Sequence, residues 1–499
     1  MPSLPGWLRP PADRFLTYLA HADSPVAGLV TAVLARLFPR AAARVKFREG
    51  NFLAALTYAE RALDAPQVAR VRDMAGVLQR PLPAPVAPRC PRGTFRGRVL
   101  QVLHSSASFD QNGYATRTEQ LVQALAEANI ASSLVTRLGY PWDLLQHRRL
   151  PTDFHDSSAN GLSYRHRLDP AFLIGGVESA YVEAYAAWIA EQADADGVDV
   201  LHAHSNYLNG LAAARAGVLT GLPVVYEMRG LWHRTRGLAQ PRYRRTDHYD
   251  YCERQELTAA MQADQVVAIS APLARWLEGQ GVPGGKITVV GNASARHEPV
   301  SPATGAFTIG YAGSFVGYEG LDLLLRALPL VREAVPDARL LLVGDGVEVP
   351  RLRKLARRLR IADAVEFTGR VTREVVRVQY RRMHVAVVPR YANEVTELVP
   401  PLKPMELMAM GVPYVASNVP PLAAVTRDGE NGLLFSAGDV PSLAAALVKL
   451  GAGRVASSPT TRPLLATLRE GGLRWAAEHA WHDNAQRYAA VYARFFEEG

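Results

Sequence analysis

The sequence has 499 residues, of which 48% are hydrophobic and 21% charged, and its formal net charge is +9. This length exceeds one ordinary hydrophobic core and predicts two domains with an appendage. Its two cysteines, Cys90 and Cys252, exclude a disulfide framework and fit a reducing cytoplasm. No run of about 18 uncharged apolar residues occurs. Residues 1–15 also lack a signal-peptide pattern. We therefore expect a cytoplasmic protein without a membrane span.

The positive charge is concentrated in residues 1–98, which hold 15 Lys and Arg against 6 Asp and Glu. The densest part contains Arg36, Arg40, Arg44, Lys46 and Arg48. Such a segment could contact anionic lipids and place the protein peripherally at the inner face of the membrane. The alternative is an arginine-rich face that is merely solvated. No recognition motif accompanies the charge, so nucleic acid is not an expected partner.

The N-terminal part, residues 1–95, is predicted to be a helical, basic appendage with a proline-rich linker. Helical spacing covers residues 25–80, and residues 48–64 look like half of a tetratricopeptide-type helix pair. One copy is too little for a repeat array, so a cap or docking element is the better interpretation. The connector that follows, RPLPAPVAPRCPRG, should be extended and semi-rigid.

Residues 96–300 alternate apolar strands with helices, which predicts a parallel, doubly wound sheet. The expected strands are 98–106, 132–138, 199–205, 223–230, 265–270 and 287–292. In such sheets ligands bind at the carboxyl ends of the strands. The residues expected at that edge are His104, Asn112, Gly113, His202, His204, Arg229 and Asn292.

Residues 301–470 repeat this pattern, with strands expected at 308–314, 338–346, 364–371, 385–390 and 413–418. The fold class is therefore α/β, with two tandem doubly wound Rossmann-like domains and an N-terminal helical appendage. The cleft between the two sheets is the expected site. Residues 471–499 are predicted to cross back to the first domain, and residues 474–498 should form one long helix.

The stretch from Arg390 to Ser417 joins two carboxylates, Glu397 and Glu406, through a double-proline turn. The prolines favour an extended approach, and a helix should begin near Pro404 and end at Gly411. Glu406 then lies in the first turn, where the helix dipole favours a carboxylate that could hold a ligand hydroxyl. The alternative is an ordinary charge at a helix N-terminus.

Two other motifs suggest ligand contacts in the first domain. Gly113 begins a helix after a strand, where free N–H groups could receive a phosphate or a hydroxyl, but the GxGxxG fingerprint of nicotinamide cofactors is absent. His202 and His204 share one face of a strand and could chelate a metal. No carboxylate or cysteine cluster near them in sequence completes such a site, so we expect no metal and a hydrogen-bonding role for His204.

In the second domain, strand ends at Gly344 and near Val371 turn on glycine, which allows a ligand to approach the backbone. Arg370, Arg390 and Lys403 follow such ends or flank the acidic stretch. Together they could neutralise a diphosphate leaving group. Each of them alone is more often a surface cation.

The segments GLDLLLRALPLVREAVPDARLLLVGDG, VEFTGRV, PLKPMELMAMGVPYVAS and RDGENGLLFSAGDVPSLAAAL together resemble the retaining, nucleotide-sugar-dependent glycosyltransferases with the GT-B fold. HAHSNYLNGLAAARA and VVYEMRGLW are similar to members that build bacterial polysaccharides. The resemblance covers residues 98–499 and excludes 1–95. It implies that the first sheet domain holds the acceptor and the second the nucleotide-sugar.

By this resemblance Glu406 corresponds to the second glutamate of a Glu-x7-Glu motif, which holds the donor's ribose. The first glutamate should stand at Leu398, so Glu397 is the candidate for it, with Glu394 as a second choice. Ser314, Tyr318 and Glu319 stand where the family has an Arg and a Lys for the diphosphate. The implied donor contacts also include Gly313, Gly344 and the backbone of Val371, and the implied acceptor side holds Asn112, Gly113, Arg117 and Arg229.

The predicted function is transfer of a sugar from a nucleotide-diphosphate donor to a lipid-linked or glycan acceptor with retention of configuration. No metal or other cofactor is required, because basic side chains and helix N-termini can stabilise the leaving group. One alternative is a sugar-nucleotide epimerase, which would turn over the donor without an acceptor. The other is a scaffold that binds nucleotide-sugar without transferring it, since fold does not determine function.

Overall fold

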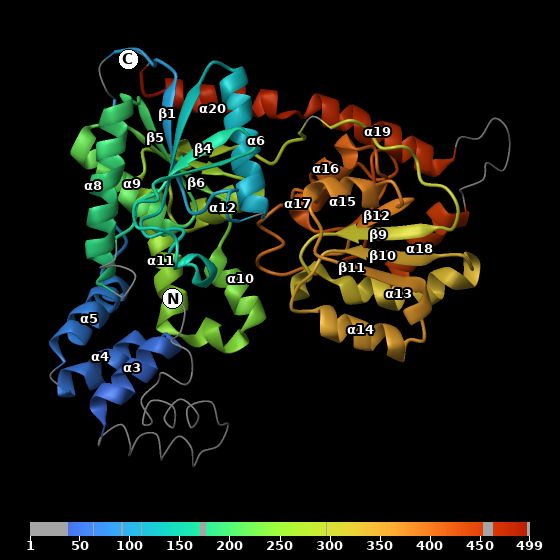
Figure 1. Ribbon diagram of the computed structural model, residues 1–499, viewed down its shortest axis with the longest axis horizontal. Coiled ribbons are helices and arrows are strands. Elements are labelled where there is room, and N and C mark those ends of the chain that lie inside the picture. Colours follow the sequence, from blue (N-terminus) through green and yellow to red (C-terminus); the bar gives the residue numbers. More distant parts are fainter. Residues whose placement is uncertain are drawn as a thin grey trace.

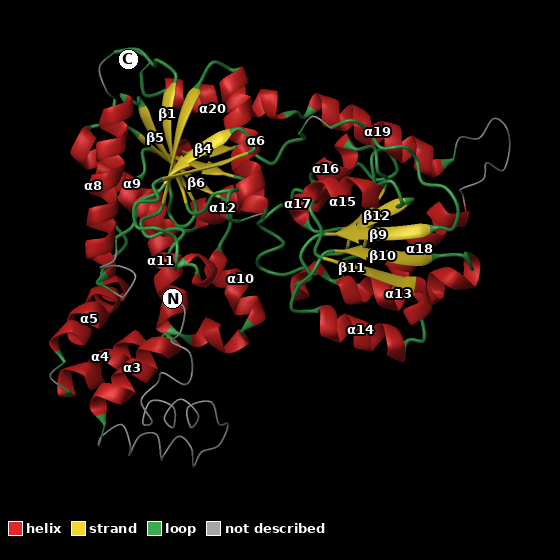
Figure 2. Cartoon of the chain, in the orientation of Figure 1, coloured by secondary structure: helices red, strands yellow, loops and turns green. Residues whose placement is uncertain are grey.

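The computed structural model describes residues 38–62, 64–90, 93–110, 112–169, 176–295, 297–452 and 463–496. Two sheet domains lie side by side, and a small helical unit extends from the first of them (Figure 1). Each sheet is covered by helices on both faces (Figure 2). The prediction of an α/β fold with two doubly wound domains is therefore confirmed.

The helical unit consists of α3 (Pro39–Glu49), α4 (Phe52–Arg61) and α5 (Ala65–Gln79). It is fixed to the first domain by an aromatic contact, because Phe52 packs edge-on against the rings of His248 and Tyr251. The Leu53 amide also donates to the Asp247 carboxylate at 2.8 Å. The part of the predicted helical region before residue 38 lies outside the described residues.

The basic cluster expected in this unit is largely engaged in local interactions. Lys46 pairs with Glu49 at 2.8 Å, and Arg40 lies 3.9 Å from Asp64. Arg44 and Arg48 also have interaction partners, and Arg36 lies outside the described residues. Among the described residues, no helix is both long and apolar enough to cross a bilayer.

The first sheet has eight strands in the order β3-β4-β2-β1-β5-β6-β7-β8, and all of its neighbours pair in parallel except β3 with β4. That β3–β4 hairpin at one edge was not predicted. The strands are β1 (Arg98–Leu103), β2 (Ala131–Thr136), β3 (Asp156–Ala159), β4 (Leu162–Arg165), β5 (Val200–His204), β6 (Val224–Met228), β7 (Gln265–Ala268) and β8 (Ile287–Val289).

Helices cover both faces of this sheet because its central strands are apolar on both sides. The helices α8, α9 and α11 pack on one face, and α6 with the C-terminal helix packs on the other. The helical segments are α6 (Gly113–Glu127), η2 (Leu145–His147), α8 (Glu178–Asp196), α9 (Tyr207–Thr220), α10 (Trp232–Ala239), η3 (Pro241–Arg245), α11 (Asp247–Gln262), α12 (Ala271–Gly279) and η4 (Gly284–Lys286).

The second sheet has six parallel strands in the order β11-β10-β9-β12-β13-β14. They are β9 (Thr308–Ala312), β10 (Arg339–Val343), β11 (Val365–Gly369), β12 (Val385–Val388), β13 (Tyr414–Ser417) and the unpredicted β14 (Leu433–Phe435). The helical segments are η5 (Gly317–Glu319), α13 (Leu321–Ala334), α14 (Val349–Arg358), η6 (Ala362–Ala364), α15 (Arg373–Tyr380), α16 (Lys403–Ala409), α17 (Pro420–Ala423) and α18 (Val440–Ala452).

The C-terminal part forms two helices, so the prediction of one long helix was wrong. Helix α19 (Leu464–Glu478) packs on the second domain through Leu468 and Trp475, and α20 (Trp481–Ala493) packs on the first. The break occurs where Ser294, in the other connection between the domains, pairs with residues 479–481. The chain thus returns to the first domain near residue 480, not at 471.

Both sheets reverse their strand order next to a central strand, which places the two favoured ligand-binding edges. In the first sheet this point lies between β1 and β5, and in the second it lies between β9 and β12. His104 follows β1, whereas Gly313 and Arg390 follow β9 and β12. Gly313 and Arg390 are among the residues that were expected to bind the donor.

Candidate active site

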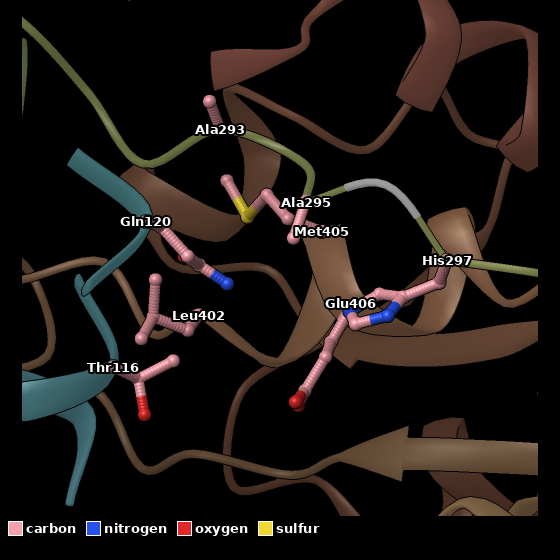
Figure 3. Close-up of a pocket in the computed structure, with 8 residues that line it drawn as sticks. All are labelled: Thr116, Gln120, Ala293, Ala295, His297, Leu402, Met405 and Glu406. Carbon is pink, nitrogen blue, oxygen red and sulfur yellow. The ribbon is translucent and has the colours of Figure 1, made fainter. Parts of the chain in front are cut away.

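Glu406 lies in the first turn of α16, as the sequence predicted. Its carboxylate has no hydrogen-bond or ion-pair partner within the part of the chain that the structure describes. The side chain borders a pocket between the two domains (Figure 3). The lining residues are Thr116, Gln120, Ala293, Ala295, His297, Leu402, Met405 and Glu406. An unpaired carboxylate in the first turn of a helix is well placed to accept hydrogen bonds from ligand hydroxyls.

Burial raises the pKa of the Glu406 carboxyl, and Lys403 and Arg373 only partly oppose this shift. The carboxylate therefore takes up a proton at a higher pH than an ordinary glutamate.

If the ionised form accepts the ligand's hydrogen bonds, donor affinity should be complete at neutral pH and should fall as the pH decreases through the raised pKa. We expect KM for the donor to rise in mildly acidic buffer, measured over a pH series, whereas Glu406→Gln should show a flat profile. A wild-type KM that is constant over this range would contradict this role.

Beside Glu406, Arg390 and Lys403 converge on a third residue, Glu319. The Nε and Nη2 atoms of Arg390 lie 3.1 and 2.8 Å from Glu319 Oε1, and Lys403 Nζ lies 2.9 Å from Oε2. Tyr311 donates its hydroxyl to Oε2 at 3.1 Å. Burial alone would raise the pKa of Glu319, but the two cations outweigh it and lower the pKa to about 2. The cluster therefore contains two positive charges and one negative charge.

Gly313 and Gly344 hold the backbone close to this cluster. Gly313 has φ 151°, and a Cβ atom there would lie 2.6 Å from Lys403 Cε. Gly344 has φ 132°, and its Cβ would lie 1.9 Å from the carbonyl oxygen of Gly313. The two glycines follow the paired strands β9 and β10. The structure therefore brings Gly313, Gly344, Arg390 and Lys403 together at one edge of the second sheet.

The other donor-side candidates are more dispersed. Ser314 and Arg370 are exposed, and Val371 is half-buried against the core of the second domain. Glu397 is exposed, and its carboxylate has no partner among the described residues. Glu394 pairs instead with Arg244 of the first domain at 2.6 Å.

Leu398, at the position where the resemblance implies a glutamate, packs against the first domain. Its side chain contacts the core of that domain, and its carbonyl oxygen accepts a hydrogen bond from Ser270 at 2.5 Å. Asn292 of the first domain similarly donates to the carbonyl of Pro400 at 3.2 Å. The segment before α16 is thus held between the domains by packing and backbone hydrogen bonds.

Arg373, at the start of α15, was not predicted and crosses the cleft. Its Nη1 atom lies 2.7 Å from the carboxylate of Glu119 on α6, and it also contacts the Thr116 hydroxyl. Asn160 of the β3–β4 hairpin binds the same carboxylate. Arg373 also influences the pKa of Glu406. No sequence signal identified this residue, because its partner lies 254 positions away.

In the first domain, a buried ionic network surrounds Glu227 near the end of β6. The Oε1 atom of Glu227 accepts from Arg117 Nε at 2.9 Å and from Arg229 Nε at 2.7 Å. Its Oε2 atom accepts from the Tyr488 hydroxyl of α20. Burial alone would raise the pKa of Glu227, but the two arginines reverse the shift and hold it well below its usual range.

The structure corrects the prediction that Arg117 and Arg229 contact the acceptor. Arg117 is 3% exposed, and its five N–H donors are directed at Glu227, Gly291, Asn292, Val290 and Tyr488. Arg229 is 8% exposed and binds Glu227, Thr118, His204 and the carbonyl of Tyr114. Both guanidinium groups are used to hold the domain together, so they are not free to bind a ligand.

His204 was predicted to hydrogen-bond a ligand in the cleft, and its placement contradicts this role. It is fully buried, with Nδ1 accepting from Arg229 at 2.7 Å and Nε2 lying 2.7 Å from Gln101 Oε1. Because arginine only donates, Nδ1 is unprotonated and Nε2 carries the hydrogen. Burial and the adjacent Arg229 hold the pKa of His204 well below its usual range, so the ring is neutral.

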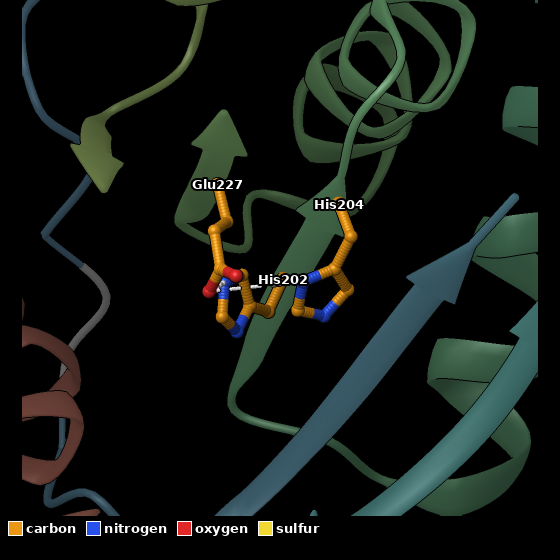
Figure 4. Close-up of side chains that lie close together, drawn as sticks. All are labelled: His202, His204 and Glu227. Carbon is orange, nitrogen blue, oxygen red and sulfur yellow. Dashed lines mark ion pairs between the residues drawn. The ribbon is translucent and has the colours of Figure 1, made fainter. Parts of the chain in front are cut away.

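His202, His204 and Glu227 lie close enough to one another to resemble a metal site (Figure 4). The carboxylate of this group was not predicted, because Glu227 comes from the next strand. However, Glu227 is already bound by two guanidinium groups, and Arg229 occupies His204 Nδ1. A cation there would face two arginine charges at contact distance, so these residues do not fit a metal.

We therefore predict that no metal bound by His202, His204 and Glu227 contributes to stability or activity. Dialysis against EDTA should leave Tm and turnover unchanged, and added Zn²⁺ should not raise Tm. A Tm that rises with Zn²⁺ and returns after chelation would contradict this prediction.

Exposed candidate residues of the first domain lie after the carboxyl ends of β1 and β6. Asn112 caps α6 by accepting from the Ala115 amide at 3.0 Å, and Gly113 begins that helix opposite Leu402 of the second domain. Trp232, which is 36% exposed, packs edge-on against His104 with ring centroids 4.4 Å apart. Sequence analysis placed His104 at this edge but gave no role to Trp232.

Comparison with known proteins agrees with this architecture. Residues 112–293 match the family described as glycosyl transferase 4-like domain, and residues 306–452 match glycosyl transferases group 1. D-inositol 3-phosphate glycosyltransferase 2 of Catenulispora acidiphila is 31% identical over 217 residues, which are 42% of this chain and 48% of the relative. The phosphatidyl-myo-inositol mannosyltransferase of Mycobacterium leprae is 39% identical over 132 residues, which are 26% and 33% of the two chains.

These curated relatives are thus matched over half of their length or less. Among solved structures, Anabaena HepE in complex with UDP-glucose superposes with a TM-score of 0.57 at 16% identity, over 80% of this chain and 99% of that one. The fold, the two matched families and the names of the relatives all indicate a glycosyltransferase. The chain therefore has the two-domain GT-B fold, with one domain similar to each of the two matched glycosyltransferase families.

Proposed function

We propose that this protein transfers a sugar from a nucleotide-diphosphate donor to a lipid-linked or glycan acceptor, with retention of the anomeric configuration. The observation that carries the proposal is the unpaired Glu406 carboxylate, which borders the interdomain pocket next to Lys403. One short helix thus carries a carboxylate that can accept hydrogen bonds from the ribose hydroxyls and a cation that can bind the phosphates of a nucleotide.

The donor's ribose would hydrogen-bond to Glu406, and its diphosphate would lie over Gly313 and Gly344 near Lys403 and Arg390. The C1–O bond of the sugar breaks as the nucleoside diphosphate departs, and the developing negative charge falls beside these cations. The acceptor's hydroxyl oxygen forms the new C1–O bond, and its proton passes to the departing phosphate oxygen. Solved HepE structures contain UDP and UDP-glucose, which supports a donor of this class. Glu319 offsets part of the positive charge, so backbone N–H groups would supply the remaining stabilisation.

The acceptor would bind at the first domain near Asn112, Gly113, His104 and Trp232. An exposed indole provides a flat apolar face for a sugar or cyclitol ring. The relatives named for inositol 3-phosphate and phosphatidyl-myo-inositol support a polar ring acceptor, in one case attached to a lipid. We propose that this transfer serves polysaccharide or glycoconjugate synthesis.

The test is a donor screen with UDP-, GDP- and ADP-sugars, which measures nucleoside diphosphate release with and without a membrane lipid extract. Release from one donor that increases strongly with the extract would support a transferase with a lipid-borne acceptor. Conversion of the nucleotide-sugar to its epimer without an acceptor would identify an epimerase instead. Nucleotide binding without turnover of any donor would favour a binding scaffold.

A further inference from the structure

Helix α14 presents a dense row of positive charge on the outer side of the second domain. The segment from Val349 to Arg360 contains six Lys and Arg and no Asp or Glu. Leu352 and Ala356 are buried in the domain core, so the cations lie on the opposite face. The exposed cations are Arg351, Arg353, Lys354, Arg357, Arg358 and Arg360.

Most of these cations lack an acidic partner among the described residues. Arg351 pairs with Glu348 and with Asp322 at 3.4 Å, and Arg353 lies over the ring of Phe367 at 4.5 Å. The side chains of Lys354, Arg357 and Arg358 form no ion pair or hydrogen bond with the described part of the chain. The acidic groups nearby are already used, since Asp363 lies 3.9 Å from Arg332 and Glu366 pairs with Arg382 at 2.5 Å.

The cations of α14 differ in their pairing from the basic residues near the N-terminus that the sequence indicated. In α3, Lys46 is paired with Glu49, and Arg44 and Arg48 also have partners. The positive charge of α14 is therefore more available to an external anion, although the charge balance of residues 1–98 had pointed to the other end of the chain. We call Arg353, Lys354, Arg357 and Arg358 the α14 basic face.

We propose that the α14 basic face docks on an anionic lipid bilayer. Helix α14 lies along the outer edge of the second domain, on the side of the sheet away from α19 (Figure 1). Its cations are spaced over successive turns of one exposed helix, which suits an extended anionic plane rather than one small anion. No exposed aromatic residue on α14 accompanies them to stack on a base, which makes nucleic acid a poorer match.

This inference rests on the proposed function and adds a location to it, because docking would keep the protein at a membrane that carries lipid-borne acceptors. The docking itself does not depend on sugar transfer. Sedimentation with lipid vesicles measures it without turnover, so failure of docking and failure of the proposed activity can be distinguished.

The experiment compares the full-length protein with a variant in which the α14 basic face is neutralised by R353Q, K354Q, R357Q and R358Q. Vesicles of phosphatidylcholine alone and of phosphatidylcholine with phosphatidylglycerol are sedimented with each protein at low and high salt. A control variant, R275Q, R474Q, R487Q and R494Q, removes the same charge from exposed positions elsewhere. A second variant, R353K, R357K and R358K, keeps the charge but changes the side chains.

We expect wild type, the control and the lysine variant to bind the anionic vesicles in a salt-sensitive manner. The neutralised variant should lose about tenfold or more in the vesicle partition coefficient, because each cation near an anionic surface contributes to binding. Equal binding by the neutralised variant and wild type would overturn the proposal. An equal loss in the control, or wild-type binding to a duplex RNA but not to anionic vesicles, would also overturn it.

Discussion

Replacing Glu406 with alanine is expected to lower kcat/KM for the donor by about 10- to 100-fold, because hydrogen bonds to a charged group are among the stronger polar contacts. The loss should appear mainly in donor KM if the carboxylate holds the ribose equally in the ground state and the transition state. Initial rates of nucleoside diphosphate release measure both constants. Glu406→Gln should be intermediate, since its amide oxygen accepts hydrogen bonds without the charge.

The matched control is Glu333→Ala, which removes an exposed glutamate from α13 in the same domain. It should leave both kinetic constants unchanged, because surface substitutions have small effects. Circular dichroism would confirm that the Glu406 variants are folded. If Glu406→Ala kept wild-type kcat/KM, the ribose-binding role of this residue would be refuted.

Replacing Arg117 with alanine is expected to lower the free energy of unfolding by about 3–5 kcal/mol, because it leaves the buried Glu227 carboxylate with one guanidinium fewer. Arg117 also binds Tyr488, so the substitution removes a contact between α6 and α20. Chemical denaturation and the shift of Tm measure this loss. Arg487→Ala, an exposed change on α20, should stay within about 0.5 kcal/mol of wild type.

The network also gives the pH dependence of stability a definite sign. The folded pKa of Glu227 lies well below its usual range. Its contribution is therefore present above the unfolded pKa and is lost as the pH falls towards the folded pKa. Wild type should lose this contribution in acid, and Arg117→Ala should lose less. A change of under about 1 kcal/mol for Arg117→Ala at neutral pH would show that the network contributes little.

Local sequence patterns were sufficient for the repeating architecture. Apolar runs ending in glycine or a polar residue marked the central strands, and Gly113 marked the start of α6. The β3–β4 hairpin was missed because residues 156–165 are polar and short, and β14 has only three residues. The break between α19 and α20 was missed because good helix formers continue through it, whereas pairing with Ser294 imposes the break.

Only some roles of the candidate-site residues could be predicted from the sequence. Glu406 could be placed because proline spacing and helix propensity are local properties. The roles of Arg117 and His204 could not, because they depend on contacts distant in the chain, and Arg117 meets Tyr488 across 371 positions. At the cation cluster, Glu319 is joined by Arg390 and Lys403 from 71 and 84 positions further along. Such convergence is visible only in three dimensions.

The central claim is that the donor nucleotide lies at the end of the second sheet with its ribose on Glu406. A crystal structure of the protein with the nucleoside diphosphate of its donor tests this directly. The account predicts ribose hydroxyls within hydrogen-bond distance of the Glu406 carboxylate, and a diphosphate over Gly313 and Gly344 within reach of Lys403. A nucleotide bound elsewhere, or one whose ribose does not contact Glu406, would contradict it.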